Sequence, residues 1–348
     1  MKRKINITAK MVKKCVLLLL LVAIVVLLGY LTIESFDKDF VSSNSSIPED
    51  CKISGLYKEY VDSYKDAKMP ANKKIEATFD KDASDALNQE AGTDLYTGKA
   101  GSFKNTDGQM YDFIYSGEQG SLVYKVNVEE AGFYNILLRY VAMDEHMNGD
   151  DTHTWEASGG ADIEREIQIN GSVPFDSLSV ISFTRTWHDG GTALTDINGN
   201  EIKPKQVELQ KVHESYVRDS IGYVTEPYLV YFEAGENTIT INSIRENMGI
   251  INLYVTSKES YEPYADYKAK YANKPVVSGS KTIKIEGESA VARSASTIYA
   301  VSDKTSLFTT TTKEGVEENA SPLKLILNTI GGAKWTTPGS WITWEFEV

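Results

Sequence analysis

Alternating apolar and polar positions recur through the middle of the chain. In SLVYKVNV, residues 121 to 128, the apolar side chains Leu122, Tyr124, Val126 and Val128 alternate with mostly polar ones, the pattern of a half-buried strand. EEAG then turns the chain, and FYNILLRYV is expected to return it as a hairpin. YLVYFEAGENTITINSI predicts another hairpin, and GIINLYVTS a closing strand.

A tight hairpin is expected to follow the segment IEREIQI. IEREIQI leads into Asn170-Gly171, a dipeptide that accepts positive φ at both turn positions. Short strands with turn signals and no long helix between them predict one complete β-sandwich, or jelly roll, over residues 71–258. The fold class expected is therefore mostly β.

Part of this pattern occurs twice. A short helix over 55–70 and a helical linker over 259–280 each carry tyrosines spaced three and four apart, on one helical face. Similar strands follow at 73–80 and 281–290, and GSLVYKVNV from 120 resembles GSWITWEFEV at 339–348. Residues 281–348 thus correspond to the beginning of a second, incomplete sandwich. We expect them to be poorly ordered, or completed by a second polypeptide, because a lone strand pair is marginal in water.

The N-terminus is different in character. Six basic residues precede an uncharged run, CVLLLLLVAIVVLLGYLTI, which approaches the roughly 20 residues that span a bilayer. The positive-inside rule makes 1–35 a basic cytoplasmic tail with a transmembrane helix, 36–54 a polar linker, and the bulk of the chain extracellular. A single-pass protein of the cell membrane is preferred to a cleaved signal peptide, since no small-residue cleavage site follows the run.

Charge and cysteine content limit the partners. Removing the six N-terminal charges from the net charge of −13 leaves −19 for residues 34–348, which argues against nucleic acid. Only Cys51 lies outside the apolar run, so no disulfide can form within the exterior part.

Two long polar segments, 143–162 and 186–227, are candidates for function because such loops in compact domains are often functional. They carry the aromatic candidates for sugar binding, Trp155, Trp187, Tyr216 and Tyr223. For Trp187 and Tyr223, packing beneath the loop is the alternative.

Charged and titratable residues add little catalytic signal. Arg245 and Glu246 could bind a ligand through charged hydrogen bonds, or form a salt bridge that fixes their loop. His146 and His153 fit no compact zinc pattern and indicate a solvated acidic loop, and His188 and His213 are expected in loops. No nucleophile motif or metal-ligand signature stands out, so an enzyme is not expected.

The order of several motifs carries a family resemblance. IEA, AGFYNILLRY, IQING, FEAGENTITI and GIINLYV together resemble the galactose-binding-like sandwiches of family 6 and family 35 carbohydrate-binding modules. YKEYVDSYKDAKMP, DINGNEIKPKQVE, GYVTEPYLVYF, SIREN and LNTIGGAKWTTPGSWITWEFEV are similar to the N-terminal region of large bacterial extracellular solute-binding proteins of carbohydrate ABC transporters. The family's two-lobed solute-capturing domain does not follow these motifs here.

The resemblance implies a carbohydrate ligand, and as further partners an ABC transporter permease or a downstream solute-binding polypeptide. It also implies calcium, for which the first strand of such modules supplies carboxylates at alternate positions. The second repeat has Glu286 and Glu288, whereas the first has Glu76 and, in the closing strand, Asn252. The alternative is that these are ordinary polar surface residues.

The leading hypothesis is a membrane-anchored extracellular carbohydrate-binding protein, the N-terminal part of a sugar ABC-transporter solute-binding protein. The alternative is a non-catalytic surface spacer or protein-interaction module.

Overall fold

The structure is a computed structural model of the 348-residue chain. It describes residues 55–91, 97–143, 161–274, 282–302, 310–313, 316–319, 325–336 and 339–347. The chain divides into two units, Met1–Lys52 and Ile53–Val348, and every described residue belongs to the second. The predictions for 1–35 and 36–54 therefore lie outside the described residues.

Within the part of the chain that is described, no helix has the length and apolar character needed to cross a membrane.

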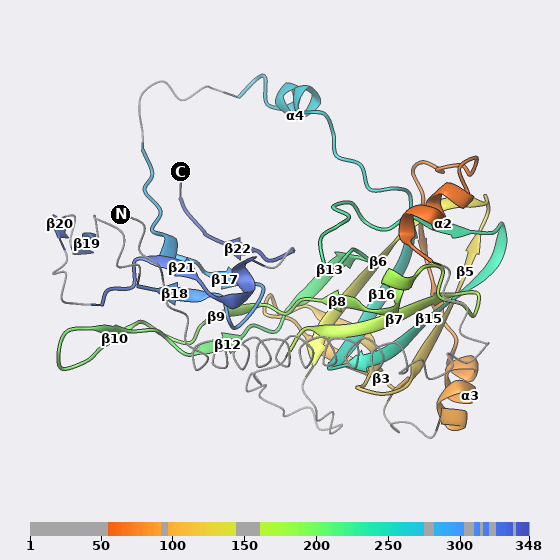
Figure 1. Cartoon of the computed structure of the whole chain (residues 1–348), viewed down its shortest axis with the longest axis horizontal. Coiled ribbons are helices and arrows are strands. Elements are labelled where there is room, and N and C mark those ends of the chain that lie inside the picture. Colours follow the sequence, from red (N-terminus) through yellow and green to blue (C-terminus); the bar gives the residue numbers. More distant parts are fainter. Residues whose placement is uncertain are drawn as a thin grey trace, which may run out of the picture. The chain divides into compact units, whose positions relative to one another are not determined.

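Two antiparallel sheets form the larger part of the described fold (Figure 1). The seven-stranded sheet has the order β13-β6-β16-β4-β3, with β1 paired to β16 and β14 to β6. Its strands are β1 (Lys74–Glu76), β3 (Ala100–Lys104), β4 (Met110–Ser116), β6 (Gly132–Met143), β13 (Val212–Tyr216), β14 (Val230–Phe232) and β16 (Asn247–Thr256). The five-stranded sheet has the order β2-β5-β15-β7-β8. Its strands are β2 (Thr78–Phe79), β5 (Ser121–Val128), β7 (Ile163–Ile169), β8 (Ile181–Phe183) and β15 (Gly235–Arg245).

The main core lies between these sheets, which makes the fold a β-sandwich. Ile136 and Leu138 of β6 belong to the same buried cluster as Leu122 of β5 and Ile239 of β15. Strand β6 is buried along nearly its whole length, since Val141 contributes to a second, smaller cluster. The sequence prediction of a mostly β sandwich is confirmed at this level.

The two expected hairpins at EEAG and EAGE are wrong. Strand β5 pairs with β2 and β15, whereas the following β6 pairs with β13, β14 and β16 in the other sheet. Likewise β14 pairs with β6, and the following β15 with β5 and β7. Alternation of apolar residues shows which face a strand buries, but not which strand lies beside it. Each turn instead carries the chain from one sheet to the other.

Glycines help both of these crossings. A Cβ at Gly132 would lie 2.6 Å from the carbonyl oxygen of Lys68, so only glycine fits there without a shift. Gly235 has φ of 105°, in the region that favours glycine.

At Asn170-Gly171 the tight turn forms, but the hairpin expected there does not. The two residues have φ of 51° and 79°, and Ile169 and Ser172 form a single bridge across them. The partner strand of β7 is β8, which begins only after a 3-10 helix, η1 (Asp176–Ser179).

Helix α2 (Tyr57–Ser63) places its tyrosines against the sandwich. The phenol oxygens of Tyr57 and Tyr60 accept hydrogen bonds from the backbone N–H groups of Leu229 and Tyr231, at 3.1 and 2.8 Å. Leu229 directly precedes β14 and Tyr231 lies within it, and β6 is the one strand paired with β14 among the described residues. The ring of Tyr64 stacks on that of Tyr231, with centroids 4.3 Å apart. Helix α2 thus covers an exposed strand edge.

Helix α3 (Lys81–Ala91) was not predicted from the sequence. Asp80 caps it, because its carboxylate accepts a hydrogen bond from the N–H of Ala83. The helix is fixed to β5 by buried Ser84, whose hydroxyl accepts from the N–H of Val123 at 2.9 Å.

Residues 186–209, which we call the arm, contain strands where the sequence indicated irregular structure. The arm holds β9 (Trp187–Asp189), β10 (Leu194–Thr195), β11 (Glu201–Ile202) and β12 (Gln206–Glu208). Strand β9 pairs with β12, and β10 with β11.

The described part of the second repeat pairs with this arm. A four-stranded sheet has the order β12-β9-β17-β22, joining the arm to β17 (Ala292–Arg293) and β22 (Ile342–Thr343) (Figure 1). The remaining elements are β18 (Tyr299–Val301), β19 (Thr310–Lys313), β20 (Val316–Asn319), β21 (Thr329–Gly331), η2 (Gly287–Ser289) and η3 (Ala333–Thr336). The strand expected at 281–290 does not form in the described residues, where 282–286 has no regular secondary structure and leads into η2.

Helix α4 (Tyr264–Lys270) corresponds to α2 in the second repeat. Its tyrosines Tyr264, Tyr267 and Tyr271 are 76%, 49% and 50% exposed. The same spacing of rings is therefore covered in the first repeat and open in the second.

Candidate ligand-binding cleft

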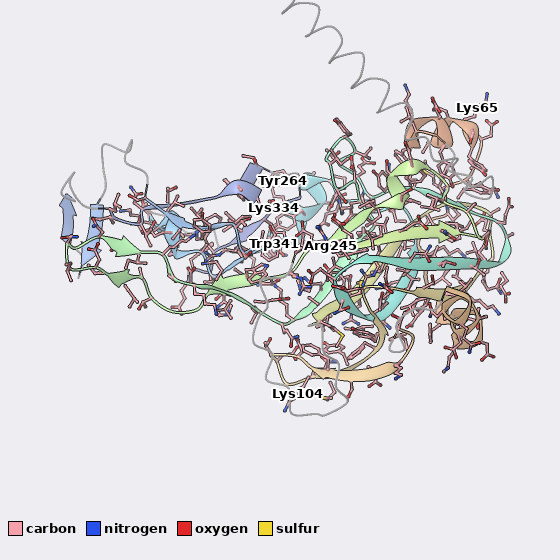
Figure 2. All side chains as sticks on the ribbon, turned by 60° about the horizontal axis from the view of Figure 1, so that its bottom comes forward. Lys65, Lys104, Arg245, Tyr264, Lys334 and Trp341 are labelled. Atoms are coloured by element: carbon pink, nitrogen blue, oxygen red, sulfur yellow. The ribbon has the colours of Figure 1, made fainter. Side chains whose placement is uncertain are left out.

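A cleft of about 670 Å³ lies where the edge strand β13 meets the starts of β7 and β8 and the second repeat. Its walls include Arg245 at the end of β15, and Lys334 and Trp341 of the second repeat, which Figure 2 marks. Segments far apart in the sequence therefore share one concave surface, as is usual for ligand sites.

A stacked pair of rings, partly exposed His213 over buried Tyr140, underlies this surface. His213 lies parallel to Tyr140, with an interplanar angle of 13° and centroids 5.0 Å apart. The Tyr140 hydroxyl donates to the carbonyl oxygen of Thr184 at 2.8 Å, which fixes the pair. Burial lowers the pKa of His213 to about 3, helped by the charges of Lys211 and Arg185. His213 is therefore a neutral, flat group at neutral pH.

Two more aromatic side chains line the cleft, each next to a cation. The Lys211 ammonium lies 5.4 Å from the ring centroid of Trp341. The Arg218 guanidinium lies 5.7 Å from that of Tyr216. Both distances are within the range of cation–π attraction, which holds the cations over the rings.

Charges in the cleft are largely matched. Arg245 pairs with Glu164 at 2.6 Å, and Lys334 with Asp162 at 2.7 Å. Paired groups keep free lone pairs and N–H donors that can still bind a polar ligand. Such a surface suits a neutral ligand rich in hydroxyls better than a strongly charged one.

Behind the cleft lies a buried arginine network. Arg185, 2% exposed, makes a bidentate pair with Glu208 at 3.0 Å and a second pair with Glu246 at 2.7 Å. Glu246 also accepts from the N–H of Ala161 and has φ of 63°, an uncommon backbone conformation for this residue type. Its carboxylate is therefore engaged in holding the end of β15, the salt-bridge alternative, although the partner is Arg185 and not Arg245.

The other predicted ligand residues have different positions. Tyr216 and Arg245 line the cleft, and their contact with a ligand stays a prediction. Trp187 is 2% exposed, so it packs in the interior, the alternative that the sequence left open. Tyr223 is 88% exposed, outside the lining of the cleft. Trp155 lies outside the described residues, with His146 and His153.

Sequence reasoning missed other lining residues. His213 was expected in a loop but lies on β13, and His188 lies on β9. Lys211 and Trp341 were not assigned to a ligand site. The alternation in VHESY could have indicated β13, but its polar residues favour a loop reading when no pairing partner is known.

The predicted calcium residues of the first repeat do not fit a cation. The Asn252 amide nitrogen donates to Glu76 at 2.6 Å, and the Asn252 carbonyl oxygen accepts from Arg139 at 3.2 Å. Arg139 thus uses the amide oxygen that calcium would need, and its positive charge disfavours a neighbouring metal ion.

In the second repeat, Glu286 forms an ion pair with Lys284 at 2.8 Å. One carboxylate oxygen of Glu288 is buried without a hydrogen bond, and burial raises its pKa, with the charges of Glu286 and Glu201 adding to the effect. Among the described residues, no group of three or more acidic, histidine or cysteine side chains is placed to hold a metal ion.

No protein-family model matches the chain, and no curated protein matches it. Among solved structures it is similar to a family 35 carbohydrate binding module from Clostridium thermocellum, at 15% identity and a TM-score of 0.25, covering 47% of this chain and 95% of that one. It is also similar to a family 35 module from Cellvibrio japonicus Abf62, at 12% identity and a TM-score of 0.25, covering 54% and 95%. A third is the C-terminal family 6 module of LamC, from Zobellia galactanivorans, at 12% identity and a TM-score of 0.23, covering 53% and 98%. At these TM-scores the likenesses carry no argument, and the sandwich assignment rests on strand pairing and the shared core.

Proposed function

We propose that this protein binds carbohydrate in the cleft described above. The observation that carries the proposal is the combination of partly exposed rings, His213, Tyr216 and Trp341, with matched polar groups on one concave surface. Sugars present apolar C–H faces and many hydroxyl groups, so a site for them combines aromatic surfaces with hydrogen-bond donors and acceptors. Tyr216 and Arg245 serve here as ligand contacts.

The proposed role is binding without catalysis. A glycosidase needs one carboxyl group that carries a proton and a second that is ionised. In the cleft, Asp162 and Glu164 are each already engaged in an ion pair, with Lys334 and Arg245 respectively. These acids are therefore better suited to accepting hydrogen bonds from ligand hydroxyls.

The cellular setting is a further part of the proposal. The basic residues and apolar run at the N-terminus support a single-pass anchor that leaves the cleft outside the cell. The motif resemblance supports a place in a sugar-uptake system, next to an ABC transporter permease or a solute-binding polypeptide. The alternative is a surface spacer that binds no sugar.

A glycan array tests the binding proposal. The full-length chain in detergent is applied as wild type, Tyr216→Ala, and Tyr264→Ala as the matched control, since Tyr264 is exposed on α4 outside the cleft. We expect a retained glycan class that Tyr216→Ala loses and Tyr264→Ala keeps. If the folded wild type is retained on no glycan, the spacer alternative replaces this proposal.

A further inference from the structure

The second repeat is attached to the arm by a buried ion pair. The Arg293 side chain is fully buried and makes a bidentate contact with Asp189 of β9, at 3.1 and 2.9 Å. It also donates to the side chain of Gln206 and to the carbonyl oxygen of Ala290. The Arg293 guanidinium has a fixed geometry, because two of its N–H groups donate in parallel to the two carboxylate oxygens of Asp189.

Trp341 is connected to this anchor through one residue. Ser294, next to Arg293, donates its N–H to the carbonyl oxygen of Trp341 at 3.1 Å. In return, the Ser294 hydroxyl accepts from the N–H of Trp341 at 3.0 Å. The backbone of Trp341 is thus held relative to Arg293, and through it to the arm.

The ring of Trp341 then reaches the first repeat. It lines the cleft, with the Lys211 ammonium near its ring. Lys334, seven residues before Trp341, forms an ion pair with Asp162 at 2.7 Å. Trp344 differs, because its indole N–H donates to Gly287 inside the second repeat. Of these two tryptophans, only Trp341 is among the residues that line the cleft.

We propose that the second repeat supplies one wall of the carbohydrate site, with Trp341 as a ligand-contacting ring and Arg293–Asp189 as the pair that positions it. This inference rests on the proposed function. The second repeat then forms part of the ligand site of the first repeat and is not an unfinished separate module. The ligand class is a sugar chain or ring long enough to touch both Tyr216 and Trp341.

Affinity measurements on the full-length chain test the role of Trp341, using the glycan found on the array. Trp341→Ala should weaken binding about tenfold or more, as for a buried aromatic anchor. Trp335→Ala is the matched control, because Trp335 is 43% exposed and lies outside the cleft lining. It should bind as the wild type does.

Asp189→Asn tests the positioning role. It should weaken binding by a factor similar to Trp341→Ala, and the double variant should be no weaker than Trp341→Ala alone, because both changes remove the same ring contact. Asp189→Glu keeps the charge and should restore part of the affinity. Far-ultraviolet circular dichroism checks that each variant is folded.

Three results are decisive. Loss of binding in Tyr216→Ala with unchanged binding in Trp341→Ala overturns this inference and leaves the proposed function standing. Independent, additive losses in Asp189→Asn and Trp341→Ala overturn the positioning role. A wild type that binds no glycan removes the proposed function, and this inference with it.

Discussion

Removing one phenol oxygen from α2 should destabilise the sandwich measurably. Tyr60→Phe keeps the ring, which packs 5.1 Å from that of Phe175, and removes only the acceptor of the Tyr231 N–H. Burial raises the pKa of Tyr60 far above its usual value, so the group lost is a neutral hydroxyl. The change therefore isolates one hydrogen bond at the open edge of β14.

The magnitude follows from what happens to the N–H donor. A buried donor left without an acceptor costs about 1–3 kcal/mol. Since Tyr231 is only partly buried, water can replace some of the interaction, and the lower end, about 1 kcal/mol, applies. For a unit of this size that corresponds to a fall in melting temperature of roughly 2–4 °C.

The second repeat offers a matched control. Tyr267 has the position in α4 that Tyr60 has in α2, but it is 49% exposed. Tyr267→Phe should therefore change stability by less than about 0.5 kcal/mol. Thermal unfolding of both full-length variants, followed by circular dichroism, compares them. Equal melting temperatures for Tyr60→Phe and wild type would refute the view that α2 stabilises the sandwich by capping this edge.

Three further predictions concern other sites. The pKa of His213 is lowered to about 3, so its ring should keep the NMR shifts of neutral imidazole down to pH 4. In the unfolded chain this histidine takes up a proton near pH 6.5, so the free energy of unfolding should fall as the pH drops below that value. His213→Gln should make the free energy of unfolding depend less on pH in this range. Gly332→Ala should make the second repeat more sensitive to limited proteolysis, because a Cβ there would overlap the Thr297 carbonyl. Gly171→Ala is the control: its Cβ would have open space, so the change should lower the free energy of unfolding by only about 1 kcal/mol and leave the digest unchanged. Millimolar calcium should change the melting temperature of the wild type and of Glu76→Ala by the same amount. A calcium-dependent rise that Glu76→Ala loses would show that calcium does bind at Glu76.

The sequence predicted which face of a strand or helix is buried better than it predicted which strands lie side by side. Leu122 and Val126 were correctly placed on a buried face, and the spacing of Tyr57 and Tyr60 correctly predicted one helical face. The sheet that each strand joins depends on packing between segments far apart in the chain, so the crossings at Gly132 and Gly235 looked like hairpins.

The same limit applies to the cleft. Tyr216 and Arg245 stand out in the sequence as an aromatic and a cation in polar segments, and both line the cleft. Trp341 was not assigned to the site from the sequence, because its contact with Lys211 depends on how the second repeat pairs with the arm. Trp187, an aromatic residue in a long polar segment, looks like a sugar-binding residue in the sequence, yet its side chain is buried. Its burial follows from the pairing of β9, which the sequence does not reveal.

The pairing of β1 with β16 has a consequence for the order of folding. Lys74 lies opposite Thr256, so the first strand of the sandwich finds its neighbour only when about 180 further residues have been made. At 5–20 residues per second, a ribosome needs roughly 9 to 36 seconds for that stretch. Because both crossings send consecutive strands into opposite sheets, few local hairpins can form in the meantime. The nascent chain therefore exposes apolar strands for seconds before the sandwich closes, an interval in which a chaperone would be useful to it.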